Sequence, residues 1–242
     1  MRPSRGLLGA LAGAQIVYGR VPPQRLTGAT RAIVALMLAA STAEAVEERG
    51  ARRGALPVAA AGALGFTVEL AGVATGRPFG HYTYSGKLGP RVGGVPLLAA
   101  AAWAMMARPA WVVAGLLSRR RAPRVALAAG ALTAWDVFLD PRMAREGYWT
   151  WPGGGRYEGI PATNFLGWLA TGAGVFAVWS LLDPDDDPAA DGDGALALYA
   201  WTWAGEAVAN AVLWRRPVVA AAGALAMGAF AAPALAVRLR AR

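Results

Sequence analysis

The 21 residues 162–182, Ala-Thr-Asn-Phe-Leu-Gly-Trp-Leu-Ala-Thr-Gly-Ala-Gly-Val-Phe-Ala-Val-Trp-Ser-Leu-Leu, contain no charged side chain. A helix needs about 20 mostly apolar residues to cross the hydrocarbon core of a bilayer, so this run is long enough. Six further stretches qualify, at 28–46, 55–76, 93–117, 122–140, 195–214 and 217–237, and a shorter one lies at 6–18. The sequence therefore predicts an all-α, multi-pass transmembrane bundle of about seven to eight helices.

The composition also indicates a membrane protein and excludes several kinds of site. Hydrophobic residues make up 56% of the 242-residue chain and charged residues only 16%, against about 25% charged in a soluble domain. Cysteine is absent and His81 is the one histidine, which excludes thiolate chemistry and a histidine-rich metal site. The net charge of +9 comes almost entirely from arginine, which favours contacts with lipid head groups over nucleic-acid binding. We expect one integral domain over 1–242, located in the cell membrane.

The predicted helix 55–76 carries an acid near its end. Glu69 shares a helical face with Gly72 and Gly76 because these residues are three and four positions apart. The chain then enters a loop that contains Tyr82 and Tyr84. An aromatic belt at the membrane interface is an alternative explanation for these rings.

A second pair of acids lies at the end of the predicted helix 122–140. Asp136 and Asp140 are four residues apart and share a helix face just before Pro141, which we expect to end the helix. Repulsion in a low-dielectric site should leave one of the two carboxyl groups protonated at neutral pH, so the pair is a candidate general acid. Two alternatives are a solvated pair at a helix end and a magnesium–diphosphate site with Arg142 and Arg145.

Other polar features have simpler explanations. We expect Glu44 to lie at a solvated helix end, and Glu206 to pair helices through a buried hydrogen bond with Asn210. The acidic segment 183–194 is expected to be a solvated loop, because it departs from the calcium-loop pattern. Two predicted spans separate the loops 77–92 and 141–161, so both should emerge on the same membrane face.

Aromatic and amide side chains accompany the acids along the sequence. A cation over an aromatic face gains about 0.5–1 kcal/mol when exposed and about 2 kcal/mol when desolvated. Several such faces together could shelter a tertiary carbocation, although tryptophan belts are also common in membrane proteins. The candidate substrate-binding residues are Tyr82, Tyr84, Trp103, Trp135, Trp149, Trp151, Tyr157, Asn164 and Trp168.

A long ordered series of uncommon residues covers about 66–170. It runs through Glu69 to Tyr84, Leu88-Gly89-Pro90, Gly94-Val95-Pro96, Trp103-Ala-Met-Met106, Trp135-Asp136 to Asp140-Pro141, Gly147-Tyr-Trp149-Thr-Trp151, Tyr157-Glu-Gly159-Ile-Pro161 and Asn164-Phe165-Leu-Gly167-Trp168. This series resembles the membrane carotenoid-biosynthesis family that contains the CruF-type carotenoid 1,2-hydratases.

The resemblance implies that water adds to the terminal double bond of an acyclic carotenoid end group, without a redox cofactor. We expect Asp140, or else Asp136, to deliver the proton, and Glu69 with the other aspartate and Asn164 to orient water. The expected partners are a carotenoid, membrane lipid and other enzymes of the pathway, and no metal is expected. The alternatives are a magnesium-dependent membrane isoprenoid transferase and a non-catalytic carotenoid-binding or assembly subunit.

Overall fold

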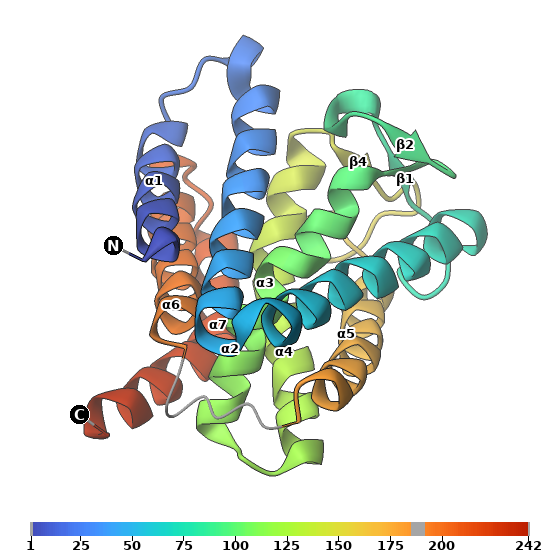
Figure 1. Ribbon diagram of the computed structural model, residues 1–242. Helices are drawn as coiled ribbons and strands as arrows, with labels where there is room; N and C mark the ends of the chain where they lie inside the picture. Colours follow the sequence, from blue (N-terminus) through green and yellow to red (C-terminus); the bar gives the residue numbers. More distant parts are fainter. Residues whose placement is uncertain (1, 185–191, 242) are drawn as a thin grey trace.

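The computed structural model describes residues 2–184 and 192–241, which form a bundle of helices (Figure 1). Its helices and strands follow one another in the order α1 (Pro3–Tyr18), α2 (Pro23–Thr75), β1 (Thr83–Tyr84), the 3₁₀ turn η1 (Gly86–Leu88), β2 (Arg91–Val92), β3 (Val95–Pro96), α3 (Leu97–Leu117), α4 (Arg121–Arg145), β4 (Trp149–Thr150), α5 (Ala162–Leu182), α6 (Asp193–Val208), the π-helical turn η2 (Ala209–Leu213) and α7 (Pro217–Arg240). The predicted all-α membrane bundle is confirmed.

Within the described ranges, five helices are long and apolar enough to cross a membrane: α2, α3, α4, α5 and α7. The 53-residue helix α2 contains two of the stretches expected to span, 28–46 and 55–76. The expected stretch 195–214 is divided between α6, of 16 residues, and the π-helical turn η2. The early stretch 6–18 is helical and forms most of α1.

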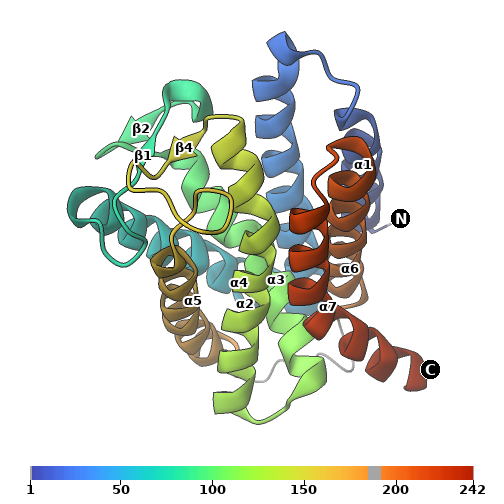
Figure 2. The same cartoon turned by 180° about the vertical axis from the view of Figure 1, so that it is seen from behind.

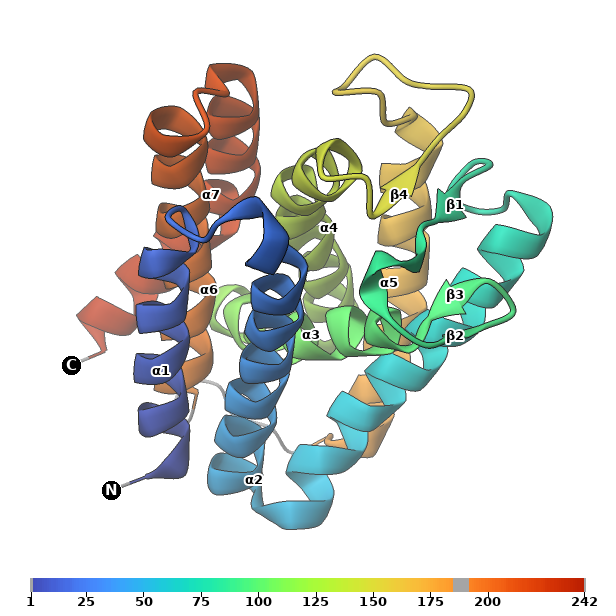
Figure 3. The same cartoon turned by 90° about the horizontal axis from the view of Figure 1, so that it is seen from above.

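Helix α2 bends sharply at Gly50, where φ is 78° and ψ is 164°. Glycine adopts this backbone conformation readily because it has no Cβ. Close by, Gly54 packs so tightly that a Cβ there would overlap the backbone of Ala45. The second half, 51–75, consequently runs away from the first toward α5 and the small strands (Figure 3). The bend therefore directs the part of α2 that carries Glu69 away from α1 (Figure 3).

Glu44 does not lie at a solvated helix end as expected. Its side chain is 3% exposed and accepts an ion-paired hydrogen bond of 3.0 Å from Arg108 Nε. The reason is that α3 packs across both halves of α2 as the most enclosed helix, with every residue from Trp103 to Gly115 buried. Glu44 and Arg108 therefore join α2 to α3 inside the bundle.

The two long loops, which we expect to emerge on the same membrane face, pair with each other in the structure. Strand β1 pairs antiparallel with β4, placing Thr83 opposite Thr150 and Tyr84 opposite Trp149. Figure 2 shows β4 beside β1 soon after α4 ends, and the rest of this loop lying above α5 before the chain enters that helix. A second short ladder joins β2 to β3 within the first loop. The pairing of β1 with β4 holds the ends of α2 and α4 close together.

The acidic loop is only partly described, because residues 185–191 lie outside the described ranges. At its start, Asp183 is buried and accepts hydrogen bonds of 2.8 and 2.9 Å from the guanidinium of Arg49. At its end, Asp193 lies 3.0 Å from Nε of Arg238. These two contacts attach the ends of the loop to α2 and α7.

Small residues allow the helices to approach closely. A Cβ at Gly65 would overlap the indole ring of Trp103, and a Cβ at Gly223 would overlap the ring of Phe138. Lipid offers no hydrophobic drive for helix association, so such contacts must come from close packing. Gly65 therefore fixes where the Trp103 ring lies beside Glu69.

Candidate active site

Glu69 and Asp140 line one small cavity of about 50 Å³, which we call the acid pocket. Its walls come from α2, α3, α4, α5 and the two loops that the β1–β4 ladder joins. The lining residues are Val34, Glu69, Phe79, Tyr82, Tyr84, Leu88, Leu98, Ala99, Ala102, Met105, Leu139, Asp140, Met143, Trp149, Trp151, Asn164 and Trp168. The pocket is therefore mainly apolar and aromatic, with two carboxyl groups in its wall.

The carboxylate of Glu69 is held by three aromatic donors. Its Oε2 accepts hydrogen bonds from the hydroxyls of Tyr82 (2.5 Å) and Tyr84 (2.8 Å), and its Oε1 accepts one from Nε1 of Trp103 (3.1 Å). Glu69 is only 5% exposed. A buried carboxylate needs such partners to offset its lost hydration. The arrangement fixes the orientation of this acid.

Asp136 and Asp140 are joined by one amide. Nδ2 of Asn164, in the first turn of α5, donates to Oδ2 of Asp136 (2.9 Å) and to Oδ2 of Asp140. Oδ1 of Asp140 accepts a further hydrogen bond of 3.0 Å from Nε1 of Trp149. Asp136 is completely buried, and its Oδ1 has no hydrogen-bond partner among the residues that the structure describes. The two aspartates therefore face a common donor, with Asp140 nearer the cavity.

Pro141 does not end its helix, contrary to expectation. Helix α4 continues through Pro141 to Arg145. Proline lacks the N–H that would bond to the carbonyl four residues earlier, which belongs to Val137. The hydroxyl of Tyr157 donates to that carbonyl at 2.9 Å and replaces the missing bond.

The phenols of the loops remain neutral donors at neutral pH. Burial and the adjacent Glu69 raise the pKa of Tyr82 and Tyr84 well above the ordinary value of 10.0. Burial and the nearby Glu158 raise the pKa of Tyr157 to about 12. These hydroxyls therefore keep their protons and their hydrogen bonds.

Most of the aromatic candidates surround the acid pocket. Tyr82, Tyr84, Trp149, Trp151 and Trp168 line it. The ring of Tyr84 lies edge-on to that of Trp149 at 5.6 Å between centroids, and the ring of Tyr82 lies 6.0 Å from that of Trp151. Aromatic faces from both loops therefore lie beside the two acids.

Three candidates lie behind the pocket wall. Trp103 stacks on Trp168 at 4.0 Å between ring centroids, and Trp135 meets Trp168 edge-on at 6.1 Å. Tyr157 contacts the backbone of α4 and the ring of Phe165. The structure places all three as supports of the wall, outside the lining itself.

The apolar part of the lining was not among the site residues predicted from the sequence. Phe79 lines the pocket, and its carbonyl accepts a hydrogen bond of 3.1 Å from Nε1 of Trp151. Leu139 and Met143 lie on α4 beside Asp140, and Met105 comes from α3. Ordinary apolar residues in helices carry no signal that separates a pocket wall from the core.

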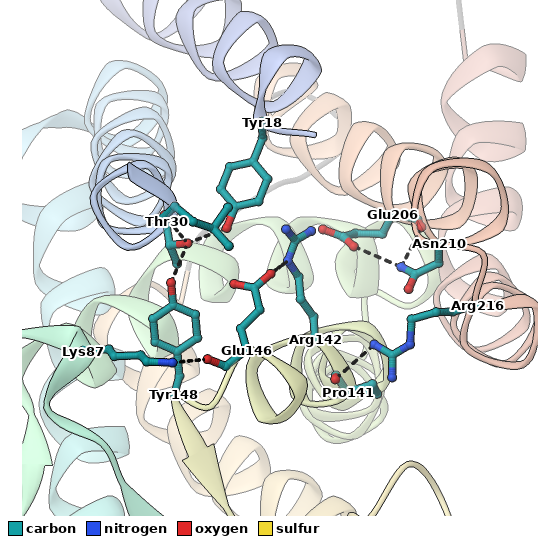
Figure 4. A network of polar contacts seen from close by, with 11 residues as sticks. Tyr18, Thr30, Lys87, Pro141, Arg142, Glu146, Tyr148, Glu206, Asn210 and Arg216 are labelled. Carbon is teal, nitrogen blue, oxygen red and sulfur yellow. Dashed lines mark hydrogen bonds and ion pairs between the residues drawn. The ribbon is translucent and has the colours of Figure 1, made fainter. Parts of the chain in front are cut away.

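A second cavity of about 480 Å³, which we call the side chamber, lies between α1, α2, α4 and α6. Arg142 faces it, stacked on the rings of Tyr18 (4.4 Å) and Trp214 (3.6 Å). Its Nε also donates to Glu146 at 3.0 Å, and Glu206 lies nearby (Figure 4). Arg142 does not line the acid pocket and Arg145 is exposed, so neither takes the position expected for a diphosphate site.

Glu206 and Asn210 form the predicted hydrogen bond, at 3.3 Å (Figure 4). The bond lies within α6 and η2, however, so it does not pair two helices as expected. The π-helical turn places Asn210 near the carboxyl group one turn earlier. Arg142 of α4 lies near the Glu206 carboxyl group and attracts it electrostatically (Figure 4).

Comparison with known proteins gives the family. Residues 27–230, most of the chain and all of the acid pocket, match the family described as "Carotenoid biosynthesis protein". The chain belongs to this family. The carotenoid biosynthesis family was also the one indicated by the motifs between Glu69 and Trp168.

One curated relative of this carotenoid biosynthesis protein is the bisanhydrobacterioruberin hydratase of Haloarcula japonica. The two are 32% identical over 127 residues, which cover 50% of this chain and 43% of the relative. The chain thus matches less than half of the relative's length. No solved structure shows a significant match.

Proposed function

We propose that this protein is a membrane carotenoid hydratase that adds water by acid catalysis to the terminal double bond of an acyclic end group. Membership of the carotenoid biosynthesis family and similarity to a hydratase support the substrate class and the reaction. The observation that carries the proposal is the acid pocket, where Asp140 and Glu69 lie beside aromatic faces in a mainly apolar cavity.

Asp140 acts as the general acid. It delivers its proton to C2 of the terminal double bond, and the electron pair of that bond forms the new C–H bond. Asp136 and Asn164 position it, because Asn164 donates to both aspartates. Proton transfer by a positioned side chain contributes about 10²- to 10⁴-fold in rate.

The cation at C1 is tertiary and lies among aromatic rings. Trp149, Trp151, Tyr82 and Trp168 all line the pocket and offer faces to it. Each such contact stabilises a desolvated cation by about 2 kcal/mol. The same walls limit the access of bulk water, so that the cation meets a bound water.

Glu69 orients that water. Its three hydrogen bonds to Tyr82, Tyr84 and Trp103 hold the carboxylate in place. The water oxygen bonds to C1, and one of its protons passes to the aspartate pair, which restores the acid. The balance is one water added across one double bond, without oxidation or reduction.

The test is expression in a lycopene-producing bacterium, with pigments analysed by mass. The unmodified protein should yield pigment heavier by one water per modified end. Asp140→Asn should lower that product at least about 100-fold, because it removes the transferable proton. The Asp140→Asn variant should still retain pigment, because the asparagine side chain keeps an oxygen that can accept the hydrogen bond from Trp149.

Asp193→Asn is the matched control, because Asp193 is 63% exposed at the start of α6, and it should leave product unchanged. Product from Asp140→Asn equal to that of the control would contradict the role of Asp140. Unchanged pigments from well-folded unmodified protein, across several acyclic carotenoids, would overturn the hydratase. Chelation of divalent metals should not lower the product, whereas a magnesium-dependent transferase would lose activity.

A further inference from the structure

The side chamber adjoins the acid pocket. Four residues line both cavities: Val34, Met105, Leu139 and Met143. These side chains form a thin partition between the two spaces. Two of them are methionines, whose unbranched side chains adapt readily to a changed shape. The partition is therefore the kind of wall that a ligand can pass by moving side chains alone.

Helix α4 presents one face to each cavity. Trp135, Phe138 and Arg142 line the side chamber, and they follow the three- and four-residue spacing of one helical face. Asp140 lines the acid pocket on the other face. A chain-like ligand lying in the chamber would thus have its end directed around α4 toward the acid.

The two cavities differ in volume, and this difference indicates different roles. The acid pocket holds about 50 Å³, against about 480 Å³ in the side chamber. The first has room for water-sized groups but not for the body of a long polyene. A substrate whose end lies at Asp140 needs a further apolar space for its body, and the side chamber adjoins that point.

The side chamber opens on the outer surface of the bundle. Ile16 of α1, Val208 of α6 and Leu213 of η2 line it, and they are 59%, 60% and 59% exposed. Exposed apolar side chains on a membrane-spanning bundle face lipid tails. A hydrocarbon dissolved in the bilayer can therefore reach the chamber without crossing water.

Polar side chains that line the chamber have partners within its wall or just behind it (Figure 4). Hydroxyls of Tyr18 and Tyr148 meet that of Thr30 at 2.5 and 3.0 Å. Arg142 bonds to Glu146 and stacks between two rings. This wall does not require a charged ligand, and the apolar residues supply most of the remaining surface.

We propose that the side chamber binds the hydrocarbon body of an acyclic polyene while its end group passes the Val34–Met105–Leu139–Met143 partition into the acid pocket. This inference rests on the proposed function for what happens at the end group. The binding of the polyene body is a separate property and can be measured without catalysis.

Gly205 provides the test. It lines the side chamber, and a Cβ there would meet no atom within 4 Å, so a large side chain can extend into the space. Gly174 of α5 is the matched control: it is an exposed helical glycine with nothing within 4 Å of its Cβ position, and it lines neither cavity. Gly205→Phe and Gly174→Phe are purified from lycopene-producing cells. Retained lycopene per protein and the hydrated fraction are measured, with thermal unfolding as the folding check.

We expect Gly205→Phe to retain about ten-fold less lycopene than Gly174→Phe, equivalent to about 1.4 kcal/mol in binding, and its yield of hydrated pigment to fall with it. If Gly205→Phe does not fold, Ala204→Phe replaces it in the same wall. Equal lycopene retention in the two variants, or no retention by the unmodified protein, would contradict the proposal that the side chamber binds the polyene. If lycopene retention depends on Gly205 but no hydrated pigment forms, the result would support polyene binding in the side chamber and contradict the proposed hydratase activity.

Discussion

The side-chain amide of Asn164 determines how the two aspartates relate to each other. Its single nitrogen donates to both Asp136 and Asp140 from the first turn of α5. The positive end of the helix dipole favours negative charge at such a position. Asn164 therefore allows a second carboxyl group to lie beside the first in a buried site, which is otherwise costly.

The phenol of Tyr157 should make stability depend on pH in the alkaline range. Its pKa is raised by burial from 10.0 to about 12, so the folded protein holds this proton more tightly than the unfolded chain. The stabilisation is present in full below pH 10 and is lost as pH rises toward 12. The unmodified protein should thus lose stability relative to Tyr157→Phe across this window, measured as thermal unfolding midpoints at successive pH values. A stability difference that does not change with pH would contradict the expectation.

The packing of α2 against α3 depends on the absence of a side chain at Gly65. Gly65→Ala should displace the indole of Trp103 and lower the free energy of unfolding by about 1–3 kcal/mol, as overpacked sites do. The displacement also removes the hydrogen bond from Trp103 to Glu69. Denaturant or thermal unfolding in detergent measures the change.

Gly28→Ala is the control on the same helix. Gly28 is exposed and a Cβ there would meet nothing within 4 Å, so alanine should stabilise α2 by up to about 1 kcal/mol. The two substitutions are chemically identical and should have opposite signs. Equal effects would show that helix propensity, and not contact with Trp103, governs Gly65.

The helices themselves follow from local sequence, but their irregularities do not. Long apolar runs predicted the membrane helices, and the two spans between the loops predicted only that both loops lie on the same face. The continuation of α4 through Pro141 could not be foreseen, because the replacement donor, Tyr157, is 16 residues further along. Likewise, nothing near Glu44 identifies Arg108 as its partner, 64 residues away.

The acids of the pocket were visible in the sequence because carboxylates are rare in membrane helices. Their grouping was inferred from motifs, whereas their partners come from tertiary structure. The side chamber could not be predicted from the sequence, because its lining is assembled from residues of several helices. Trp135, Arg142 and Glu206 were singled out in the sequence for other reasons, and most of the remaining lining residues are ordinary apolar residues of their helices.

The ion pair of Glu44 and Arg108 ties the bundle together near its centre. Arg108→Met should lower the free energy of unfolding by about 3–5 kcal/mol, because it leaves the buried Glu44 carboxylate without this partner. Replacing both residues by methionine should recover most of the loss, since the uncompensated charge is also removed. Thermal unfolding monitored by tryptophan fluorescence compares the variants. A double variant no more stable than Arg108→Met would mean that the arginine acts mainly through other contacts.

The β1–β4 ladder has a consequence for exchanging parts between members of the family. Thr83 faces Thr150 and Tyr84 faces Trp149, and these last two rings contact Glu69 and Asp140 respectively. In a chimera that exchanges only one of the two loops, β1 and β4 would come from different proteins, and their side chains would no longer be matched across the ladder. The segments 76–96 and 146–161 therefore form a single transplantable cassette, and should be swapped together.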